Sequence, residues 1–279
     1  MSEKYKTIIK ANSPWKPFDF KEILRYKDMF YFKSLNSYKA QQRQTVLSYI
    51  WIFVDPVVNI IFFSVVFGHL AKISLEGSPY DGMSYTAFNA AAMAGWIFMR
   101  TGLARSPNSL VEERNLLDKV YFPRIFIPII PTIVNLPNFL IQLVCTQIVL
   151  AYFGHFPSWN YWAIIPILLC MVIYSVALGL FLTTFMLQFR DLPRIWGYIM
   201  QYYVYTLPLA YPLTNIPEKY AFLYLLNPGV SLIEGFRAAL LGVAIPWGSI
   251  GISLSFSLFL LYVGAVIFRH KEPNIVDAL

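Results

Sequence analysis

Charged residues are scarce in this sequence. They make up 13% of its 279 residues, whereas apolar residues make up 57%. A soluble domain usually carries about 25% charged residues, so this composition excludes a soluble fold of this size. Cysteine is also rare. Cys145 and Cys170 both fall in apolar stretches, where a thiol behaves as a small hydrophobic group, and they predict neither a disulfide framework nor a metal site.

The residues that catalysis needs are missing as well. The glycine-rich GK[ST] loop that binds nucleotide phosphates does not occur, so any use of ATP is expected to come from another subunit. His69, His155 and His270 stand far apart in the chain, and their spacing supports no metal site. No acid, base and nucleophile gather in one stretch, so we do not expect catalysis by this chain.

Six long apolar runs are what the sequence does contain. A helix needs about 20 apolar residues to cross a bilayer core of roughly 30 Å, and each run is near or above that length. We therefore predict an all-α membrane protein with six transmembrane helices in a domain of residues 46–268. The runs cover residues 46–68, 85–104, 123–153, 161–187, 195–213 and 247–268.

The basic residues indicate how these runs are oriented. Of 22 Lys and Arg residues, 19 fall on one side of the runs, and only Lys72, Lys219 and Arg237 fall on the other. By the positive-inside rule both termini are cytoplasmic, including a tail of residues 269–279. The net charge of +7 then fits contact with anionic lipid headgroups and not with nucleic acid. Arg43 and Arg124, at cytoplasmic borders, are the expected headgroup contacts.

The stretch before the first run predicts an amphipathic helix within a cytoplasmic N-terminal region of residues 1–45. We expect it to lie along the membrane surface, either as a simple anchor or as a lever that also touches a cytoplasmic partner. At 100° per residue one arc of this helix is apolar and the opposite arc is charged. The apolar arc consists of Phe20, Ile23, Leu24, Phe30, Tyr31 and Leu35.

Two cytoplasmic connectors carry mixed charge. Residues 105–122 form a polar, helix-like segment, and its leucines at 110, 116 and 117 would have nothing to pack against in a lone channel. This favours a soluble partner that docks from the cytoplasm. The shorter connector places Arg190 beside Asp191 at the membrane border, where the arginine binds either lipid phosphate or the same partner.

The longest outer connector, residues 214–246, is too apolar for an exposed loop and too often broken by Pro and Gly for another span. We predict two short helices that re-enter the outer leaflet. Asn227 and Pro228 mark the turn between them. Glu234 and Arg237 lie three residues apart on the second helix, so they can pair.

Aromatic residues reach 18% of the chain and gather on the fifth run, at Trp196, Tyr198, Tyr202 and Tyr205 among others. The three tyrosines fall on one helical face. Such rings either belong to an interfacial belt or line a path for a polysaccharide, because aromatic faces stack on sugar rings. Asp55, the one acid far from the end of a run, suggests proton coupling, but it stands alone and its Asp-Pro junction also explains a kink.

Four stretches, in order along the chain, resemble one known family. They are RQTVLSYIW at 43–51, LLDKVYFPR at 116–124, FRDLPRIW at 189–196 and NPGVSLIEGFRAALLG at 227–242. Together with the amphipathic start and the six runs, they span nearly the whole chain. The chain resembles the membrane subunits, or permeases, of the ABC exporters for O-antigen, capsule and teichoic-acid polysaccharides.

This resemblance implies a homodimer that works with two separate cytoplasmic ATPase subunits, which hold ATP and Mg²⁺. It implies export of a lipid-linked glycan across the inner membrane of a bacterium, with an outer gate at Asn227, Pro228, Glu234 and Arg237. The residues implied to couple to the ATPase are Glu112, Glu113, Arg114, Leu117, Asp118, Lys119, Arg190 and Asp191. The alternatives are an exporter of a smaller lipid or drug, a membrane scaffold that does not transport, and a glycan-processing enzyme.

Overall fold

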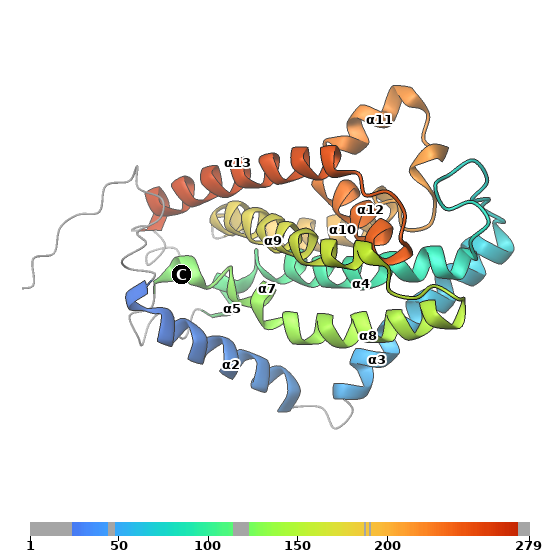
Figure 1. Cartoon of the computed structure of the whole chain (residues 1–279). Helices are drawn as coiled ribbons and strands as arrows, with labels where there is room; N and C mark the ends of the chain where they lie inside the picture. The colour runs from blue at the N-terminus through green and yellow to red at the C-terminus, as the bar shows by residue number, and fades with distance from the viewer. Residues whose placement is uncertain (1–23, 44–47, 114–122, 187, 190, 273–279) are drawn as a thin grey trace, which may run out of the picture.

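The computed structural model describes residues 24–43, 48–113, 123–186, 188–189 and 191–272. Helices dominate these residues, and no strand occurs among them, so the predicted all-α class is confirmed. Most of the long helices run along the length of the molecule (Figure 1). Three helical stretches of the described chain are long and apolar enough to cross a membrane: Ile50–Leu70, Trp159–Met186 and Trp247–Lys271.

The apolar runs of the sequence all contain helix. The first run forms α3 (Ser48–Phe63), which continues as a π-helix η1 (Ser64–Leu70). The second forms α4 (Tyr85–Arg105), and the fourth forms η3 (Trp159–Ala163) followed by α9 (Ile164–Met186). The last forms α13 (Trp247–Lys271).

Helix α4 is less apolar than its neighbours because it lies in the interior of the bundle. Its 21 residues span about 31 Å at 1.5 Å per residue, which is long enough for a bilayer core. Most of its first 19 residues are buried against α8, α9 and α12, including Asn89, whose amide donates to the Ile60 carbonyl. Arg100, which the charge count assigned to the cytoplasmic side, lies inside α4, five residues before its end.

The third run is broken into short pieces. Its helices are η2 (Arg124–Phe126), α7 (Ile130–Val134) and α8 (Leu136–Tyr152). Prolines at 123, 128, 131 and 137 cause these breaks, since each lacks a backbone N–H and cannot extend a helix from its preceding turn.

The fifth run forms a shorter helix than its 19 apolar residues predict. Helix α10 (Leu192–Tyr203) and the 3₁₀ turn η4 (Val204–Thr206) together cover 15 residues, or about 22 Å. The chain then bends at Pro208 and Pro212. The predicted continuation to residue 213 is therefore wrong, because the two prolines stop the helix.

Helices α9 and α13 pack side by side along most of their lengths (Figure 1). Gly264 of α13 allows this close approach. A Cβ placed at this position would lie 3.0 Å from the backbone nitrogen of Phe181 on α9, which is closer than ordinary packing permits. Small residues commonly bring membrane helices together in this way.

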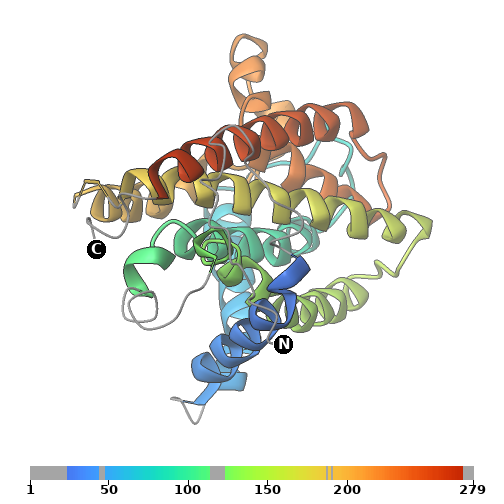
Figure 2. The same ribbon diagram turned by 90° about the vertical axis from the view of Figure 1, so that its left-hand side faces the viewer.

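The outer connector contains η5 (Leu213–Asn215) and two helices, α11 (Glu218–Leu225) and α12 (Pro228–Leu241). Helix α11 projects away from the bundle in both views (Figures 1 and 2), with Phe222 and Leu223 more than 60% exposed. Helix α12 is buried along its whole length, between α4, α9 and α13. It ends at Gly242, whose φ of +74° suits glycine as a helix C-cap.

The described part of the N-terminal region forms α2 (Lys27–Arg43), which packs beside α7. Met29, Phe30 and Tyr38 face a small apolar core there, and the rings of Phe30 and Phe126 lie 5.1 Å apart. Phe30 belongs to the predicted apolar arc as well, whereas Leu24 and Tyr31 of that arc are 66% and 60% exposed, and their contact with the membrane surface stays a prediction. The contact with α7, which helical periodicity does not reveal, sets the buried face. Phe20 and Ile23 lie outside the described residues.

Candidate functional site

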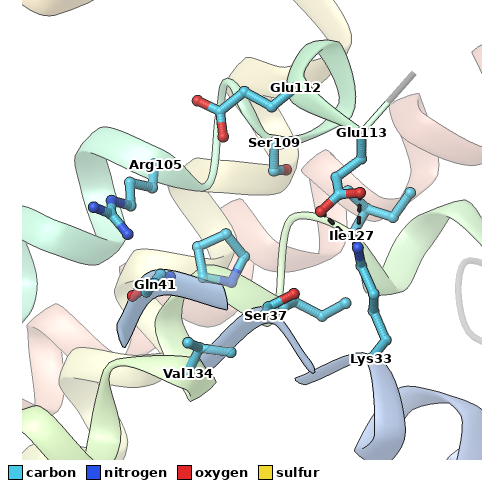
Figure 3. A pocket seen from close by; sticks show the side chains of 11 residues that line it. Lys33, Ser37, Gln41, Arg105, Ser109, Glu112, Glu113, Ile127 and Val134 are labelled. Atoms are coloured by element: carbon cyan, nitrogen blue, oxygen red, sulfur yellow. Dashed lines mark hydrogen bonds and ion pairs between the residues drawn. The ribbon is translucent and has the colours of Figure 1, made fainter. Parts of the chain in front are cut away.

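A polar cavity of about 260 Å³ lies where α2, the end of α4, the short helix α5 (Ser109–Glu112) and α7 meet (Figure 3). Figure 2 shows α2 and α5 at the same end of the bundle. The predicted orientation makes this the cytoplasmic end. The cavity is lined by Lys33, Ser37, Gln41, Arg105, Ser109, Glu112, Glu113, Ile127, Ile130, Pro131 and Val134.

One ion pair closes the side of this cavity. The Lys33 Nζ of α2 lies 2.7 Å from both carboxylate oxygens of Glu113, which directly follows α5. Both side chains are partly buried, at 22% and 33% exposure. The pair joins α2 to the predicted coupling segment, 80 residues further along the chain.

Glu112 and Arg105 lie across the cavity from this pair (Figure 3). The surrounding protein withdraws part of the Glu112 carboxyl from water, and this burial raises its pKa. The positive charge of Arg105 lowers the pKa, and the negative charge of Glu113 raises it further. Glu112 forms no ion pair with another described residue, so its carboxyl is available to a group that enters the cavity from outside the described chain.

The prediction that the leucines of residues 105–122 need a partner protein to pack against is partly wrong. Leu110 is completely buried, in the same small core as Phe126 and Ile127, so it does not need a partner to cover it. The predicted coupling residues Arg114, Leu117, Asp118 and Lys119 lie outside the described residues, as does Arg190. Asp191 is exposed at the start of α10.

Helix α10 and the following turn η4 present the three predicted tyrosines in exposed positions. Tyr198, Tyr202 and Tyr205 are 60%, 62% and 60% exposed, so each ring is accessible to a ligand, a lipid or a second copy of the chain. Trp196 does not share this exposure. It is half-buried, and its indole N–H donates to the Leu103 carbonyl of α4 over 2.9 Å, which fixes α10 to the bundle.

The sequence alone did not predict the hydrogen bonds that Tyr203 makes on the opposite face of α10. The Tyr203 hydroxyl lies 3.0 Å from the Tyr174 hydroxyl of α9 and donates to the Asn227 side-chain oxygen over 2.6 Å. Asn227 also accepts from the Gly229 backbone N–H and so caps α12. Asn227 therefore marks the predicted turn and also connects α12 to α10. Residues 24 positions apart make this contact, and no local pattern announces it.

The second outer helix contains the predicted ion pair. Glu234 and Arg237 approach to 2.7 Å, and the Arg237 side chain is completely buried. The guanidinium also donates to the backbone carbonyls of Phe88, Pro208 and Leu209 and lies 3.8 Å from the centre of the Phe88 ring.

The Tyr80 hydroxyl completes this network by donating to the second Glu234 oxygen over 2.8 Å. The Glu234–Arg237 network thus connects α12 to α4, to the bend after α10 and to the loop between η1 and α4 that contains Tyr80. Pro228, at the start of α12, is also buried. A role of these residues in an outer gate stays a prediction.

The two expected headgroup residues differ in their surroundings. Arg124 is partly buried and donates to the Glu272 backbone carbonyl over 2.7 Å, so one of its N–H groups is bound to the end of α13. Arg43 is the last residue of α2. Asp55, the candidate for proton coupling, is exposed on the surface of α3 and is not enclosed in a proton path within the described chain.

Comparison with known proteins defines the class of this bundle. The ABC-2 type transporter family matches residues 33–241, which is most of the chain. The chain belongs to this family and is a multi-pass membrane protein.

Two relatives are similar over nearly their whole length. One is the O-antigen export system permease protein RfbA of Myxococcus xanthus, 23% identical over 262 residues, which cover 93% of this chain and 98% of that protein. The other is a protein of the same description from Klebsiella pneumoniae, 23% identical over 263 residues, with 94% of this chain and 95% of that protein covered. These similarities confirm the family resemblance that the four sequence stretches indicate.

Proposed function

We propose that this protein is the permease subunit of an ATP-driven ABC transporter that exports a lipid-linked polysaccharide across the cytoplasmic membrane. Similarity to two O-antigen export permeases over at least 93% of the chain is the observation that carries the proposal. The polysaccharide is of the O-antigen, capsule or teichoic-acid type. Family membership supports a transport subunit, and the missing phosphate loop supports ATP hydrolysis by a partner.

In this proposal the chain crosses the membrane six times and keeps both termini in the cytoplasm. Three helices have the length and apolarity for crossing. Helix α4 has the length, and its polar residues are covered by other helices. The broken third run and the short α10 provide the two remaining crossings. The outer helices α11 and α12 then sit at outer-leaflet depth, where neighbouring helices cover the interrupted backbone.

The cytoplasmic cavity supports docking of a partner. We propose that an ABC ATPase subunit binds the coupling segment and the polar cavity beside it, where Glu112 and Arg105 are free of ion pairs among the described residues. The Lys33–Glu113 pair then passes movement of this segment to α2. Under this proposal α2 is a lever, not only an anchor.

A homodimer with two ATPase subunits fits the exposed faces of α3 and α10. Trp51, Phe53, Ile61 and Phe62 of α3 are each about half exposed or more, and the α10 tyrosines are similarly open. We propose that two copies enclose the glycan path, with Tyr198, Tyr202 and Tyr205 stacking on passing sugars. The α3 residues face lipid or the second copy.

A deletion strain tests this function. If the gene is removed, we expect lipid-linked glycan to accumulate on the cytoplasmic face and surface glycan to disappear, and the intact gene to restore export. Normal surface glycan in the deletion strain would overturn the proposal. Export of a smaller lipid, the second candidate, predicts normal surface glycan together with loss of that lipid from the outer leaflet.

A further inference from the structure

Exposed aromatic rings gather in the connector between α8 and α9 and at the start of α13. This connector lies at the end of the bundle opposite α5, which the proposed topology places on the outer side (Figure 1). Trp159 is 89% exposed, and Phe156, Trp162 and Trp247 are exposed as well. We call these four residues the aromatic rim. None of them lines the cytoplasmic cavity.

The backbone beneath the rim is fixed to the rest of the bundle. The Asn160 amide donates to the Val243 backbone carbonyl over 2.8 Å, which ties the connector to the segment before α13. The rings of Trp162 and Trp247 stack, with centroids 5.4 Å apart and an angle of 21° between their planes. The rim therefore holds the outer ends of α9 and α13 together, and both rings lie at the same depth.

The two segments that form the rim carry no fixed charge. Between Arg124 and Arg190 the sequence contains no Lys, Arg, Asp or Glu, and the same is true between Arg237 and Arg269. A partner of the rim is therefore recognised through ring faces and indole N–H groups, not through ion pairs.

The exposed faces of the helices below the rim are aliphatic. Positions one helical turn apart on α8 form an exposed row, which consists of Leu140, Val144 and Ile148. Ile165 and Leu169 are exposed on α9 in the same way. Aliphatic side chains suit the hydrocarbon core of a bilayer, whereas an indole, with an apolar body and a polar N–H, suits the layer above it. The change from aliphatic to aromatic marks the border of the core.

Helix lengths give the same depth. Trp247 lies 22 residues before Arg269, which belongs to the basic last turn of α13, and this separation is about 33 Å along the helix. The 23 residues of α9, which begin after Trp162, span about 35 Å. The hydrocarbon core is roughly 30 Å thick, so the rim lies just beyond it when the cytoplasmic ends lie at the inner border.

We infer that the aromatic rim lies in the headgroup layer of the outer leaflet and binds phospholipid there, which anchors the outer ends of α9 and α13. Sugar rings also stack on indoles, but the aliphatic rows directly below the rim place it at the lipid and not in water. The two copies of the proposed homodimer meet at α3 and α10, which do not carry the rim. Only the side of the membrane rests on the proposed function.

The depth of the rim can be measured with a nitroxide label. The full-length chain, with Cys145 and Cys170 replaced by alanine, is placed in phosphatidylcholine nanodiscs and labelled at Ser158→Cys. Ser158 is exposed beside Trp159, so all four rings stay in place. Paramagnetic resonance measures collisions of the label with oxygen, which dissolves in lipid, and with a nickel chelate, which stays in water. We expect a depth at the lipid phosphates.

Two further labelled positions calibrate this depth. Glu76→Cys lies in the loop between η1 and α4, where Glu76 is exposed, and its label should collide freely with nickel. Ile165→Cys lies in the aliphatic row of α9, and its label should collide mainly with oxygen. The label at Ser158→Cys should fall between them.

Removing rings tests whether they set the depth. Phe156→Ser together with Trp159→Ser should move the label at residue 158 about 5 Å toward water, because the apolar contact with the headgroup layer is lost. Phe156→Trp together with Trp159→Phe keeps two rings and should hold the depth. Phe259→Ala, which removes an exposed ring about 18 Å along α13 from Trp247, is the control and should also hold it.

Each alternative occupant gives a different result. A label at residue 158 as open to nickel as the label at residue 76 would overturn the inference, and protection of such a label by added glycan would identify a sugar site. Spin–spin broadening between labels would identify a contact between two copies and also overturn it. A headgroup depth that appears only when phosphatidylglycerol is added would contradict the uncharged contact.

The measurement stands apart from the other tests. If the double serine variant does not fold, the depth of the unsubstituted rim still decides, since it needs no ring variant. Nanodiscs leave both faces open to nickel and require no transport, so the outcome is separate from that of the deletion strain.

Discussion

Lys33 of α2 and Glu113 of the predicted coupling segment form an ion pair, with the Lys33 Nζ 2.7 Å from both carboxylate oxygens of Glu113. Lys33 lies on α2, which packs along the bundle. Glu113 lies at the edge of the cavity proposed to receive the ATPase. A displacement of one helix must therefore pull on the other or break the pair. The consequences of this link can be measured.

Exchanging the two charges tests whether the link transmits movement. Lys33→Glu places two carboxylates together and should reduce ATP-dependent export several-fold, as should Glu113→Lys alone. The pair contributes at most about 1 kcal/mol to stability, so both variants should fold. The double variant restores attraction and should recover export in the same vesicle assay. Lys39→Glu, exposed on the same helix, is the control. A double variant no better than the single variants would show that the pair does not couple.

The exposed tyrosines of α10 and η4 provide the second prediction. Replacing Tyr198, Tyr202 and Tyr205 with alanine removes three stacking surfaces, each worth about 1 kcal/mol. Surface glycan should fall about tenfold or more, while membrane insertion and ATPase binding stay normal. Phenylalanine at the three positions should do much less harm, because it keeps the ring.

Exposed tyrosines elsewhere serve as the control for this experiment. Tyr152 and Tyr262 are 85% and 53% exposed on α8 and α13, and their replacement with alanine should leave export unchanged. If the α10 triple variant exports at the normal rate, its rings face lipid and the path lies elsewhere.

The buried network around Arg237 predicts a large effect on stability. Arg237→Met leaves Glu234 buried without its partner and frees three backbone carbonyls, so it should lower the free energy of unfolding by about 3 kcal/mol or more. Adding Glu234→Leu removes the unpaired charge and should recover part of the loss. Thermal unfolding of the purified chain in detergent measures both. Equal destabilisation by the single and double variants would show that the charge of Glu234 is not the cause.

Close packing of α9 and α13 makes Gly264 sensitive. Gly264→Ala forces the two backbones apart and should destabilise the fold by about 1–3 kcal/mol. Gly251→Ala lies on the same helix in open space, and alanine there should stabilise the helix by about 0.5–1 kcal/mol. We expect Gly264→Ala to lower the unfolding temperature and Gly251→Ala to raise it. If Gly264→Ala caused no loss of stability, the close approach of the two helices would be contradicted.

Local signals in the sequence predicted what lies close along the chain. The helices follow from apolar length, the turn at Asn227 follows from its Asn-Pro dipeptide, and the Glu234–Arg237 pair follows from a spacing of three on one helix. The breaks in the third and fifth runs were also present in the sequence, as prolines, but the apolar count overlooked them.

Contacts between distant residues could not be predicted in this way. Tyr80 reaches Glu234 across 154 positions, and Lys33 reaches Glu113 across 80. Leu110 seemed to need a partner protein because its covering residues, Phe126 among them, lie on another segment. The position of Arg100 inside a helix, facing a cleft of three helices, likewise depends on tertiary structure.

Transport in inside-out membrane vesicles tests the central claim most directly. Lipid-linked glycan begins on the outward-facing cytoplasmic leaflet, and its transfer to the lumen protects it from a glycan-cleaving enzyme added outside. We predict that protection requires ATP, this chain and a second polypeptide that hydrolyses the ATP. Equal protection in vesicles that lack this chain, or ATP hydrolysis by this chain purified alone, would contradict the account.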